Sequence, residues 1–435
     1  MSQSEQRDGE RVVLIHLSDL HFRVGQDGRE ERNAFLRDKL VDDLPDVVAG
    51  TRRGHATAVI VTGDVAFSGK KEQFDLARAW LTSVCGLVGA DPTRVLCVPG
   101  NHDVDRDKIG ATHRAHRGTI ASCGEYQLDQ LLDEFLAEAD QSILTPLEAY
   151  SDFAAGSDCH FTSRVHWDIP LPLSERYHLA FRGAASVINS GPEDDAPGSL
   201  AIQRNQLLMH TRAGQINVFL AHHDPYYWSR HTILPTPPAA GASLALYGHT
   251  HTPRVSKVDE CVEITAGAVQ PDEGPDWNPT YNVIELEVHD GDDHASLDVE
   301  VWRRKFSSEV GRFVADAHGS KSLTFSVRVP AAPRGTVARA HDSSEEADPS
   351  DDREEIRAAM STPEGEPDPL REVMLRLSNI GAGARIRLLD ELGLLTDELA
   401  SMPQRQQIPA AAQAIVDGRT LSDFQAALTR LGISH

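Results

Sequence analysis

Short apolar runs alternate with longer amphipathic stretches over much of the chain. Four runs have the length of buried strands and end in polar residues: RVVLIHLS, ATAVIVTGD, RVLCVPG and INVFLAHH. Between them, residues 33–48 and 72–84 carry apolar side chains at helical spacing. Strands that alternate with helices predict an α/β layered domain, and in such domains ligands collect at the carboxyl ends of the strands.

The pattern changes after His223. The runs SLALYGH, VEITAGAV, YNVIELEV and SLDVEVWRRKF are short and rich in β-forming residues, with little helix between them. They predict a second, more antiparallel sheet that packs on the first as a sandwich. Residues 105 to about 200 include a less regular stretch, which we interpret as an insertion or cap. We expect His113 and His116, on a helix of this insertion, to be exposed or capping.

Shifts in composition divide the chain into four parts. We expect the polar residues 1–10 to be a disordered N-terminus and residues 11–330 to form one domain. Residues 331–368 are rich in Pro, Ser and acidic residues, which predicts a flexible acidic linker. Residues 369–435 have a helical pattern that includes a leucine stripe closed by Gly393. The expected fold class is therefore α/β with a small C-terminal all-α bundle.

Charge and cysteine usage narrow the setting of the protein. The 435 residues carry a net charge of −24, and a field of this sign repels phosphate backbones, so long nucleic acid is an unfavoured partner. The five cysteines are scattered and form no CxxC pair, which fits a reducing compartment. The start MSQSEQRDGE lacks the apolar core of a signal peptide, and no apolar run approaches the roughly 18 residues of a membrane span. We therefore expect a cytoplasmic protein with no membrane partner.

Side chains that can bind metal ions follow the apolar runs at five places. They are Asp19 and His21 in SDLH, Asp64 in TGD, Asn101 and His102 in PGNHD, His222 and His223 in LAHHDP, and His249 and His251 in YGHTH. Carboxylates, imidazoles and an amide oxygen, without thiolates, suit Mn, Fe or Zn. In an extended chain positions i and i+2 point the same way, so the DxH pair and the HxH pair could each share a metal site. Glycines before Asp64, Asn101 and His249 permit close backbone approach.

Each of these polar ends has a simpler explanation when taken alone. A DxH pair is usually an exposed polar pair, a GD after a strand is usually a turn, and a buried histidine is usually a hydrogen-bonded core residue. Their joint appearance at the ends of successive apolar runs favours one shared metal site. The aromatic segment YYWSR, residues 226–230, could stack on a base and clamp a phosphate, but packing on the sandwich is the favoured interpretation.

In this order, the motifs resemble those of the calcineurin-like metallophosphoesterase superfamily. Its pattern DxH, GD, GNH[DE], H and GHxH is matched over roughly residues 11–305. The segments VTGDVAFSGKKEQF and VPGNHDVDR are similar to bacterial members related to cyclic-nucleotide phosphodiesterases. The resemblance implies a four-layer α/β-β/α sandwich of the metallophosphoesterase type, with two divalent metal ions at the strand ends.

The resemblance also implies a role for each motif residue. Asp19, His21 and His251 would bind one metal ion; Asn101, His222 and His249 would bind the other; Asp64 would bridge the two. His102 would protonate the leaving oxygen or steady the phosphate, and Asp103 would orient His102. Family members often read HHPP or HHHP where this chain reads HHDP. His222 is the favoured ligand because it directly ends its apolar run, but the motif leaves His223 open.

The implied function is that of a metal-dependent phosphohydrolase, an enzyme that cleaves a phosphoester with a water activated by two metal ions. A small phosphodiester such as a cyclic nucleotide is the favoured substrate. The alternatives are a nuclease of a bacterial defence system and an adaptor or scaffold. Residues 369–435 loosely resemble the helical effector-associated domains of bacterial conflict systems, which would make them a site for a protein partner or self-association. A dimerisation bundle or a lid is the alternative for this segment.

Overall fold

The computed structural model describes residues 11–332 apart from short gaps, together with parts of residues 373–430. The gaps in the first range are residues 26–27, 125–126, 139–141, 162–163, 192–195, 230–233, 272–273, 275–276, 292–293 and 317–320. In the second range the described residues are 373, 377, 388–389, 391–394, 411–416 and 421–430. The predicted disordered N-terminus and almost all of the predicted linker therefore lie outside the described residues.

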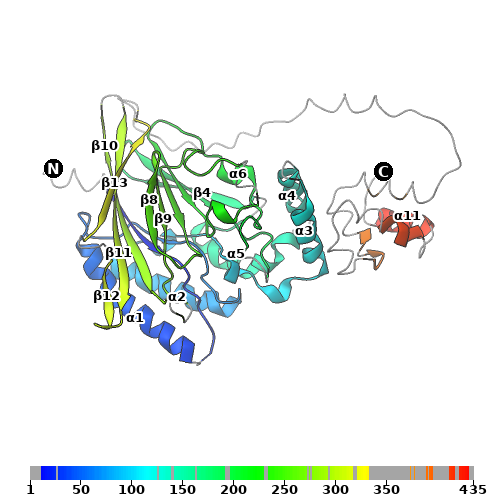
Figure 1. Cartoon of the computed structure of the whole chain (residues 1–435), viewed down its shortest axis with the longest axis horizontal. Coiled ribbons are helices and arrows are strands. Elements are labelled where there is room, and N and C mark those ends of the chain that lie inside the picture. Colours follow the sequence, from blue (N-terminus) through cyan, green and yellow to red (C-terminus); the bar gives the residue numbers. More distant parts are fainter. Residues whose placement is uncertain are drawn as a thin grey trace.

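The first sheet combines both ends of the main domain (Figure 1). Its order is β12-β11-β10-β1-β2-β3, and β13 also pairs with β11. The strands are β1 (Arg11–Leu17), β2 (Ala58–Val61), β3 (Val95–Cys97), β10 (Thr280–His289), β11 (Ala295–Ser307), β12 (Arg312–Ala315) and β13 (Leu323–Val329). The strands β1, β2 and β3 are parallel, so the loops that follow them leave the sheet at one edge.

The second sheet has the order β4-β5-β6-β7-β9-β8. Its strands are β4 (His166–Pro172), β5 (His178–Ala184), β6 (Gln215–Leu220), β7 (Leu244–Tyr247), β8 (Arg254–Val258) and β9 (Cys261–Thr265). The inner strands are parallel, and only β4 and β8 at the edges are antiparallel to their neighbours.

The prediction that the runs after His223 together form a second, more antiparallel sheet is therefore wrong. The strands β7, β8 and β9 complete the second sheet, whereas β10 returns to the first sheet and pairs with β1, placing Glu285 opposite Val13. In addition, residues 166–184 of the predicted insertion form two strands of the second sheet.

Strand alternation builds two apolar cores around the second sheet. In β6, Ile216, Val218 and Leu220 lie in the main core, whereas Phe219 between them lies in a separate cluster with Trp228. Successive side chains of a strand point to opposite faces, so one face packs into the sandwich and the other needs its own cover. That cover is a single-turn helix, α6 (Arg204–Leu207), and the irregular segments around it.

The helices lie where the apolar spacing predicts them. The first two are α1 (Gly28–Ala49) and α2 (Lys71–Val88), and the buried residues of α2 include the expected Phe74, Ala77, Leu81 and Val84. The helix α2 ends at Gly89, whose left-handed φ of 75° allows the chain to turn away. Short 3-10 turns are η2 (Pro92–Arg94), η3 (Asn101–Asp103), η4 (Arg106–Lys108), η5 (Ser142–Leu147), η6 (Ala155–Ser157) and η7 (Pro225–Tyr227).

The inserted segment folds into α3 (Ala111–Ser122), α4 (Leu128–Leu136) and α5 (Glu148–Ala154), on the side of the domain away from β10–β13 (Figure 1). The expectation that His113 and His116 are exposed or capping is wrong, because both are buried. His116 stacks on Phe135 of α4, with ring centroids 4.1 Å apart. Helix α3 therefore buries this histidine against the apolar face of α4.

The fold class is confirmed as a mixed α/β sandwich of two sheets with flanking helices. In the C-terminal part, the described residues are mainly helical, including α11 (Leu421–Arg430), and their buried residues form a separate apolar cluster. Its members are Val373, Leu377, Leu388, Leu389, Leu392, Ala411, Ala412, Ile415, Phe424, Ala427 and Leu428. None of the described helices is long and apolar enough to cross a membrane.

Candidate metal centre

The loops after β1, β2, β3, β6 and β7 bring the predicted site residues together. Four groups have ligand atoms that all lie within 4.8 Å of one another: Asp19, His21 and His251; Asp19, Asp64 and His222; His21, Asp64 and His102; and His222, His223 and His249. Asn101 joins them through its Oδ1, which lies 3.1 Å from Nε2 of His222. The groups share members, so they form one continuous centre.

Left-handed backbone marks the centre. Among the described residues, seven non-glycine residues have positive φ, and five of them belong to this centre: Asp19 (55°), His21 (43°), Asp64 (53°), His249 (69°) and His251 (53°). The pairs at i and i+2 therefore converge through left-handed turns, and the extended chain assumed from the sequence is wrong. Such conformations cost of order 1 kcal/mol each outside glycine, and they concentrate at functional sites.

Three glycines allow the loops to approach closely, as predicted. A Cβ on Gly100 would lie 2.1 Å from Oδ1 of Asp64, and one on Gly63 would lie 2.5 Å from Nδ1 of His222. A Cβ on Gly248 would lie 2.1 Å from Oγ of Ser18, in the loop after β1. The site side chains therefore occupy the space that a larger residue would need.

Asp19 and His251 form the first pair of the centre. Nε2 of His251 lies 3.0 Å from Oδ1 of Asp19, and Nε2 of His21 lies 3.9 Å from the same oxygen. Burial acts to raise the pKa of Asp19, but the hydrogen bond and charge of His251 outweigh it and lower that pKa to about 2. Asp19 is thus held as a carboxylate without any contact to solvent.

His222 is oriented by a backbone carbonyl. Its Nδ1 lies 2.7 Å from the oxygen of Thr62, so Nδ1 carries the proton in the neutral ring. That leaves the lone pair on Nε2, which faces Asn101 and lies 3.4 Å from Oδ2 of Asp64. Burial opposes protonation of this ring, yet the nearby Asp64 carboxylate raises the pKa of His222 to about 9. A bound cation would compete with that proton for the same lone pair.

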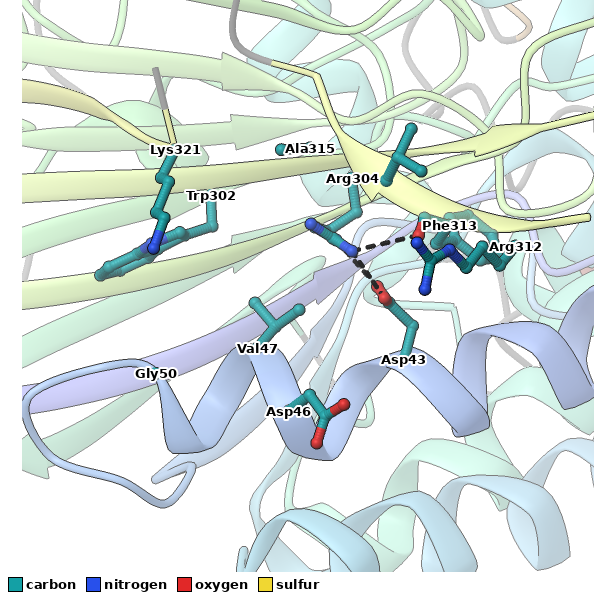
Figure 2. A pocket seen from close by; sticks show the side chains of 11 residues that line it. Asp43, Asp46, Val47, Gly50, Trp302, Arg304, Arg312, Phe313, Ala315 and Lys321 are labelled. Atoms are coloured by element: carbon teal, nitrogen blue, oxygen red, sulfur yellow. Dashed lines mark hydrogen bonds and ion pairs between the residues drawn. The ribbon is translucent and has the colours of Figure 1, made fainter. Parts of the chain in front are cut away.

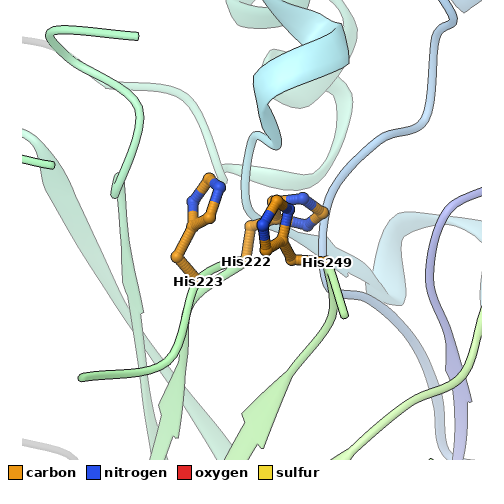
Figure 3. A group of neighbouring side chains, drawn as sticks. All are labelled: His222, His223 and His249. Atoms are coloured by element: carbon orange, nitrogen blue, oxygen red, sulfur yellow. The ribbon is translucent and has the colours of Figure 1, made fainter. Parts of the chain in front are cut away.

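His223 has a different environment. Its Nδ1 pairs with Oγ of Ser186 at 2.9 Å, and its Nε2 is buried without a hydrogen-bond partner among the described residues. Figure 3 shows its imidazole beside those of His222 and His249. Burial and these two neighbouring imidazoles hold the pKa of His223 well below its ordinary value. Of the adjacent histidines, only His222 shares a group with Asp64, although His223 also faces the centre.

The expected contact between Asp103 and His102 is wrong. The Asp103 carboxylate instead accepts hydrogen bonds from the backbone of Ala66 (2.7 Å) and Gly100 (2.9 Å), tying together the loops after β2 and β3. Burial and the Asp64 charge raise the pKa of Asp103 to about 7. His102 is oriented by its Nδ1, which lies 2.8 Å from the carbonyl oxygen of Phe67. Its backbone N–H also donates to Asp64 at 2.8 Å.

The donor set fits divalent cations. Imidazole nitrogens, two carboxylates and an amide oxygen are ligands that Mn, Fe and Zn accept. Within the described part of the chain, Oδ2 of Asp19, Nδ1 of His21 and Nε2 of His223 are buried with no hydrogen-bond partner. Buried polar atoms without partners are rare and costly, and a coordinated cation would satisfy them.

Sequence reasoning missed the groups that orient the histidines. The carbonyls of Thr62 and Phe67 leave no mark in a sequence, because every residue type carries one. Ser186 lies outside all five motifs, and only the fold brings it to His223. Each interpretation of the segment YYWSR fits part of it. Trp228 is buried in the second core, as packing on the sandwich requires, whereas Tyr226 is 61% exposed, as contact with a ligand would require.

A two-sheet sandwich with an aspartate and histidine centre at its strand ends defines a metal-dependent phosphoesterase architecture. Residues 12–253 match the family model described as calcineurin-like phosphoesterase, and the chain belongs to this family. A curated relative is the uncharacterized metallophosphoesterase-like protein YydB of Bacillus subtilis, which is 30% identical over 97 residues. That match covers 22% of this chain and 18% of YydB, so the chain spans less than a fifth of that relative.

Solved structures are similar at low identity. Vacuolar protein sorting 29 from Cryptosporidium parvum is 13% identical with a TM-score of 0.32, and the match covers 73% of this chain and 99% of that one. GAP50, the anchor in the inner membrane complex of Plasmodium, is 11% identical with a TM-score of 0.33, covering 74% and 89%.

Proposed function

We propose that the chain hydrolyses a small phosphodiester with two divalent metal ions, and that cyclic nucleotides are the first substrates to test. The observation that carries the proposal is the set of four overlapping ligand groups in a family member. A single ion would need only one group, whereas Asp64 shares one group with Asp19 and His222 and another with His21 and His102, which supports the proposed role of a shared ligand.

In this proposal Asp19, His21 and His251 would hold one ion, Asn101, His222 and His249 would hold the other, and Asp64 would be a ligand shared by both. When bound, the ions supply positive charge for the phosphoryl oxygens and make water a better nucleophile at neutral pH. The cross-tied loops would hold the ligand side chains in place. Manganese, iron and zinc all suit these ligands.

His102 is proposed to donate a proton to the leaving oxygen from Nε2. Its Nδ1–H donates to the Phe67 carbonyl at 2.8 Å, and this contact orients the ring so that Nε2 is the nitrogen left to act on the leaving oxygen. The ligand atom of His102 lies within 4.8 Å of those of His21 and Asp64, so the proton is held beside the proposed ions. A general acid of this kind contributes about 10²–10⁴-fold.

Substrates with different leaving groups separate the proposed metal-binding role of Asp64 from the proposed proton-donating role of His102. With added Mn, Asp64→Asn should abolish hydrolysis of every substrate. His102→Ala should keep p-nitrophenol release from bis-p-nitrophenyl phosphate within a few fold, since p-nitrophenolate leaves without a proton. The same variant should lose about 10²-fold on cyclic nucleotides, whose alkoxide needs one. His55→Ala, an exposed histidine outside the centre, is the matched control.

A substrate panel tests the preference for small diesters. It should contain bis-p-nitrophenyl phosphate, p-nitrophenyl phosphate, cyclic mononucleotides, cyclic dinucleotides and single-stranded DNA. The proposal expects diester activity on small substrates to exceed monoester and DNA activity. Activity on DNA alone would favour a nuclease and overturn the proposed substrate class, whereas full activity of Asp64→Asn would overturn the metal mechanism.

Residues 369–435 are proposed to be a separate helical bundle that binds a protein partner or a second copy. The separate apolar cluster of Val373, Leu388 and Phe424 supports a bundle with its own core. Size-exclusion chromatography of the full chain against a chain ending at residue 332 tests self-association.

All five cysteines are free, which supports a reducing, cytoplasmic setting.

A further inference from the structure

A cavity lies on the first sheet, outside the metal centre. It has a volume of about 510 Å³ and is formed by the C-terminal half of α1, by β11, by β12 and by Lys321 (Figure 2). None of the metal-centre residues lines it. Ligand sites in proteins commonly span roughly 300–1,000 Å³, so the cavity has room for a small organic molecule.

Arg304 and Asp43 form the middle of the cavity. Nε and Nη2 of Arg304 bind the two carboxylate oxygens of Asp43 at 2.8 and 2.6 Å, and Nη2 also donates to the Phe313 carbonyl at 3.2 Å. This bidentate pair fixes the side chains between the helix and the sheet. Trp302 lies two residues earlier on the same face of β11 and is half-buried, so part of its indole is open to the cavity.

Two cations border the same cavity. Arg312 and Lys321 are exposed, and neither side chain has an ion pair or hydrogen bond among the residues that the structure describes. In the view of Figure 2, Lys321 and Trp302 are seen towards one end of the cavity and Arg312 towards the other. In a chain of net charge −24, an aromatic ring flanked by two unpaired cations favours an elongated aromatic anion over a neutral ligand.

We propose that this cavity binds a nucleoside phosphate. The base stacks on Trp302, and the phosphate lies towards Arg312, whose planar guanidinium suits two phosphate oxygens. Asp46 lines the cavity with a carboxylate that can accept hydrogen bonds from ribose hydroxyls. Inorganic phosphate would use only the Arg312 end, and adenosine only the Trp302 end.

The cavity also contacts the helix that follows the first metal-binding loop. The helix α1 starts at Gly28, seven residues after His21, and lines the cavity through Asp43, Asp46 and Val47. A ligand there would therefore contact the helix that next follows this metal-binding loop in the chain. Binding itself does not depend on the proposed phosphodiesterase activity, so the two proposals fail separately.

Isothermal titration of the full chain tests the proposal, with AMP, adenosine and inorganic phosphate as probes and EDTA present to remove metal ions. AMP should bind more tightly than either fragment. Arg312→Ala should weaken AMP about tenfold, as expected for one exposed charge-assisted contact, and leave adenosine unchanged. Trp302→Leu should weaken AMP and adenosine alike, with thermal unfolding as the check that it is folded.

The matched control is Arg94→Ala, which removes the same charge at an exposed position outside the cavity. It should bind AMP like the wild-type chain. The proposal fails if AMP does not bind, if phosphate binds as tightly as AMP, or if Arg312→Ala and Arg94→Ala weaken AMP equally. Arg312→Ala should also hydrolyse bis-p-nitrophenyl phosphate at the wild-type rate, because its cavity is separate from the metal centre.

Discussion

Gly100→Ala should disable the metal centre by moving one carboxylate. The backbone of Gly100 has a φ of −103°, which alanine adopts freely, so the substitution adds only the volume of a methyl group. That methyl would lie 2.1 Å from Oδ1 of Asp64 and 2.5 Å from its backbone nitrogen. Asp64 cannot rotate away freely, because the same oxygen accepts from His102 N–H at 2.8 Å.

The size of the effect follows from the overlap. Ordinary contact begins at 3.4 Å, so the oxygen of Asp64 must move by 3.4 − 2.1 = 1.3 Å. A misplacement of about 1 Å can cost about 10²-fold in rate. At 1.36 kcal/mol for each tenfold change, that is about 2.7 kcal/mol of transition-state stabilisation. Overpacking should also destabilise the fold by about 1–3 kcal/mol.

The assay is Mn-dependent hydrolysis of bis-p-nitrophenyl phosphate, with thermal unfolding measured on the same preparations. The matched control is Gly86→Ala, in α2, where an added Cβ meets nothing within 4 Å. The control should keep full activity and gain up to about 1 kcal/mol of stability from helix propensity. If Gly100→Ala is folded and keeps half of the wild-type kcat/KM, the proposed bridging role of Asp64 is wrong.

Two further predictions concern buried groups near and away from the centre. Asp103→Asn should lower kcat/KM at least about tenfold on bis-p-nitrophenyl phosphate and on cyclic nucleotides alike. The reason is that the amide of the new side chain places an N–H donor against the backbone N–H of Ala66 or Gly100, where the carboxylate accepted a hydrogen bond. A loss confined to cyclic nucleotides would show instead that Asp103 acts through His102. Burial, with His116 and Arg117, lowers the pKa of His113 from 6.5 to about 4. As the pH falls, the unfolded chain therefore binds a proton at His113 before the folded chain does. Its stabilising contribution is complete above pH 6.5 and is lost as the pH falls towards 4, by about 3 kcal/mol. Thermal unfolding between pH 7.5 and 4.5 should show a flatter decline for His113→Gln than for the wild-type chain, whereas His55→Gln should leave the decline unchanged.

The polar ends of the apolar runs could be predicted to converge because parallel strands end at the same edge of a sheet. Asp19, Asp64 and Asn101 follow β1, β2 and β3, which are neighbours in that order. His222 and His249 follow β6 and β7, which are neighbours in the second sheet. Within each sheet these motifs follow one another in space in the same order as in the chain. The sequence pattern was therefore sufficient to predict that their side chains converge.

The return of β10 to β1 could not be predicted in this way. The strand YNVIELEV has the alternation of a half-exposed strand, and that pattern does not name a partner. Its place depends on backbone pairing with β1, such as Ile284 opposite Leu14, across more than 260 residues. The burial of His113 and His116 could not be predicted for the same reason, since it depends on the elements packed against their helix, as the ring of Phe135 packs on His116, and not on the helix that carries them.

The left-handed residues explain why the centre needs the whole sandwich. Asp19 and His21 cannot hold such conformations on their own, because each costs of order 1 kcal/mol. Their N–H groups donate to the carbonyls of Gly63 and Asp64 at 3.1 and 2.9 Å, and the Asp19 carbonyl accepts from Gln270 at 3.1 Å. The strain at the first loop is therefore held by loops that follow β2 and β9, one from each sheet. A short segment such as SDLH carries the ligands, but only the packed sheets give them their directions.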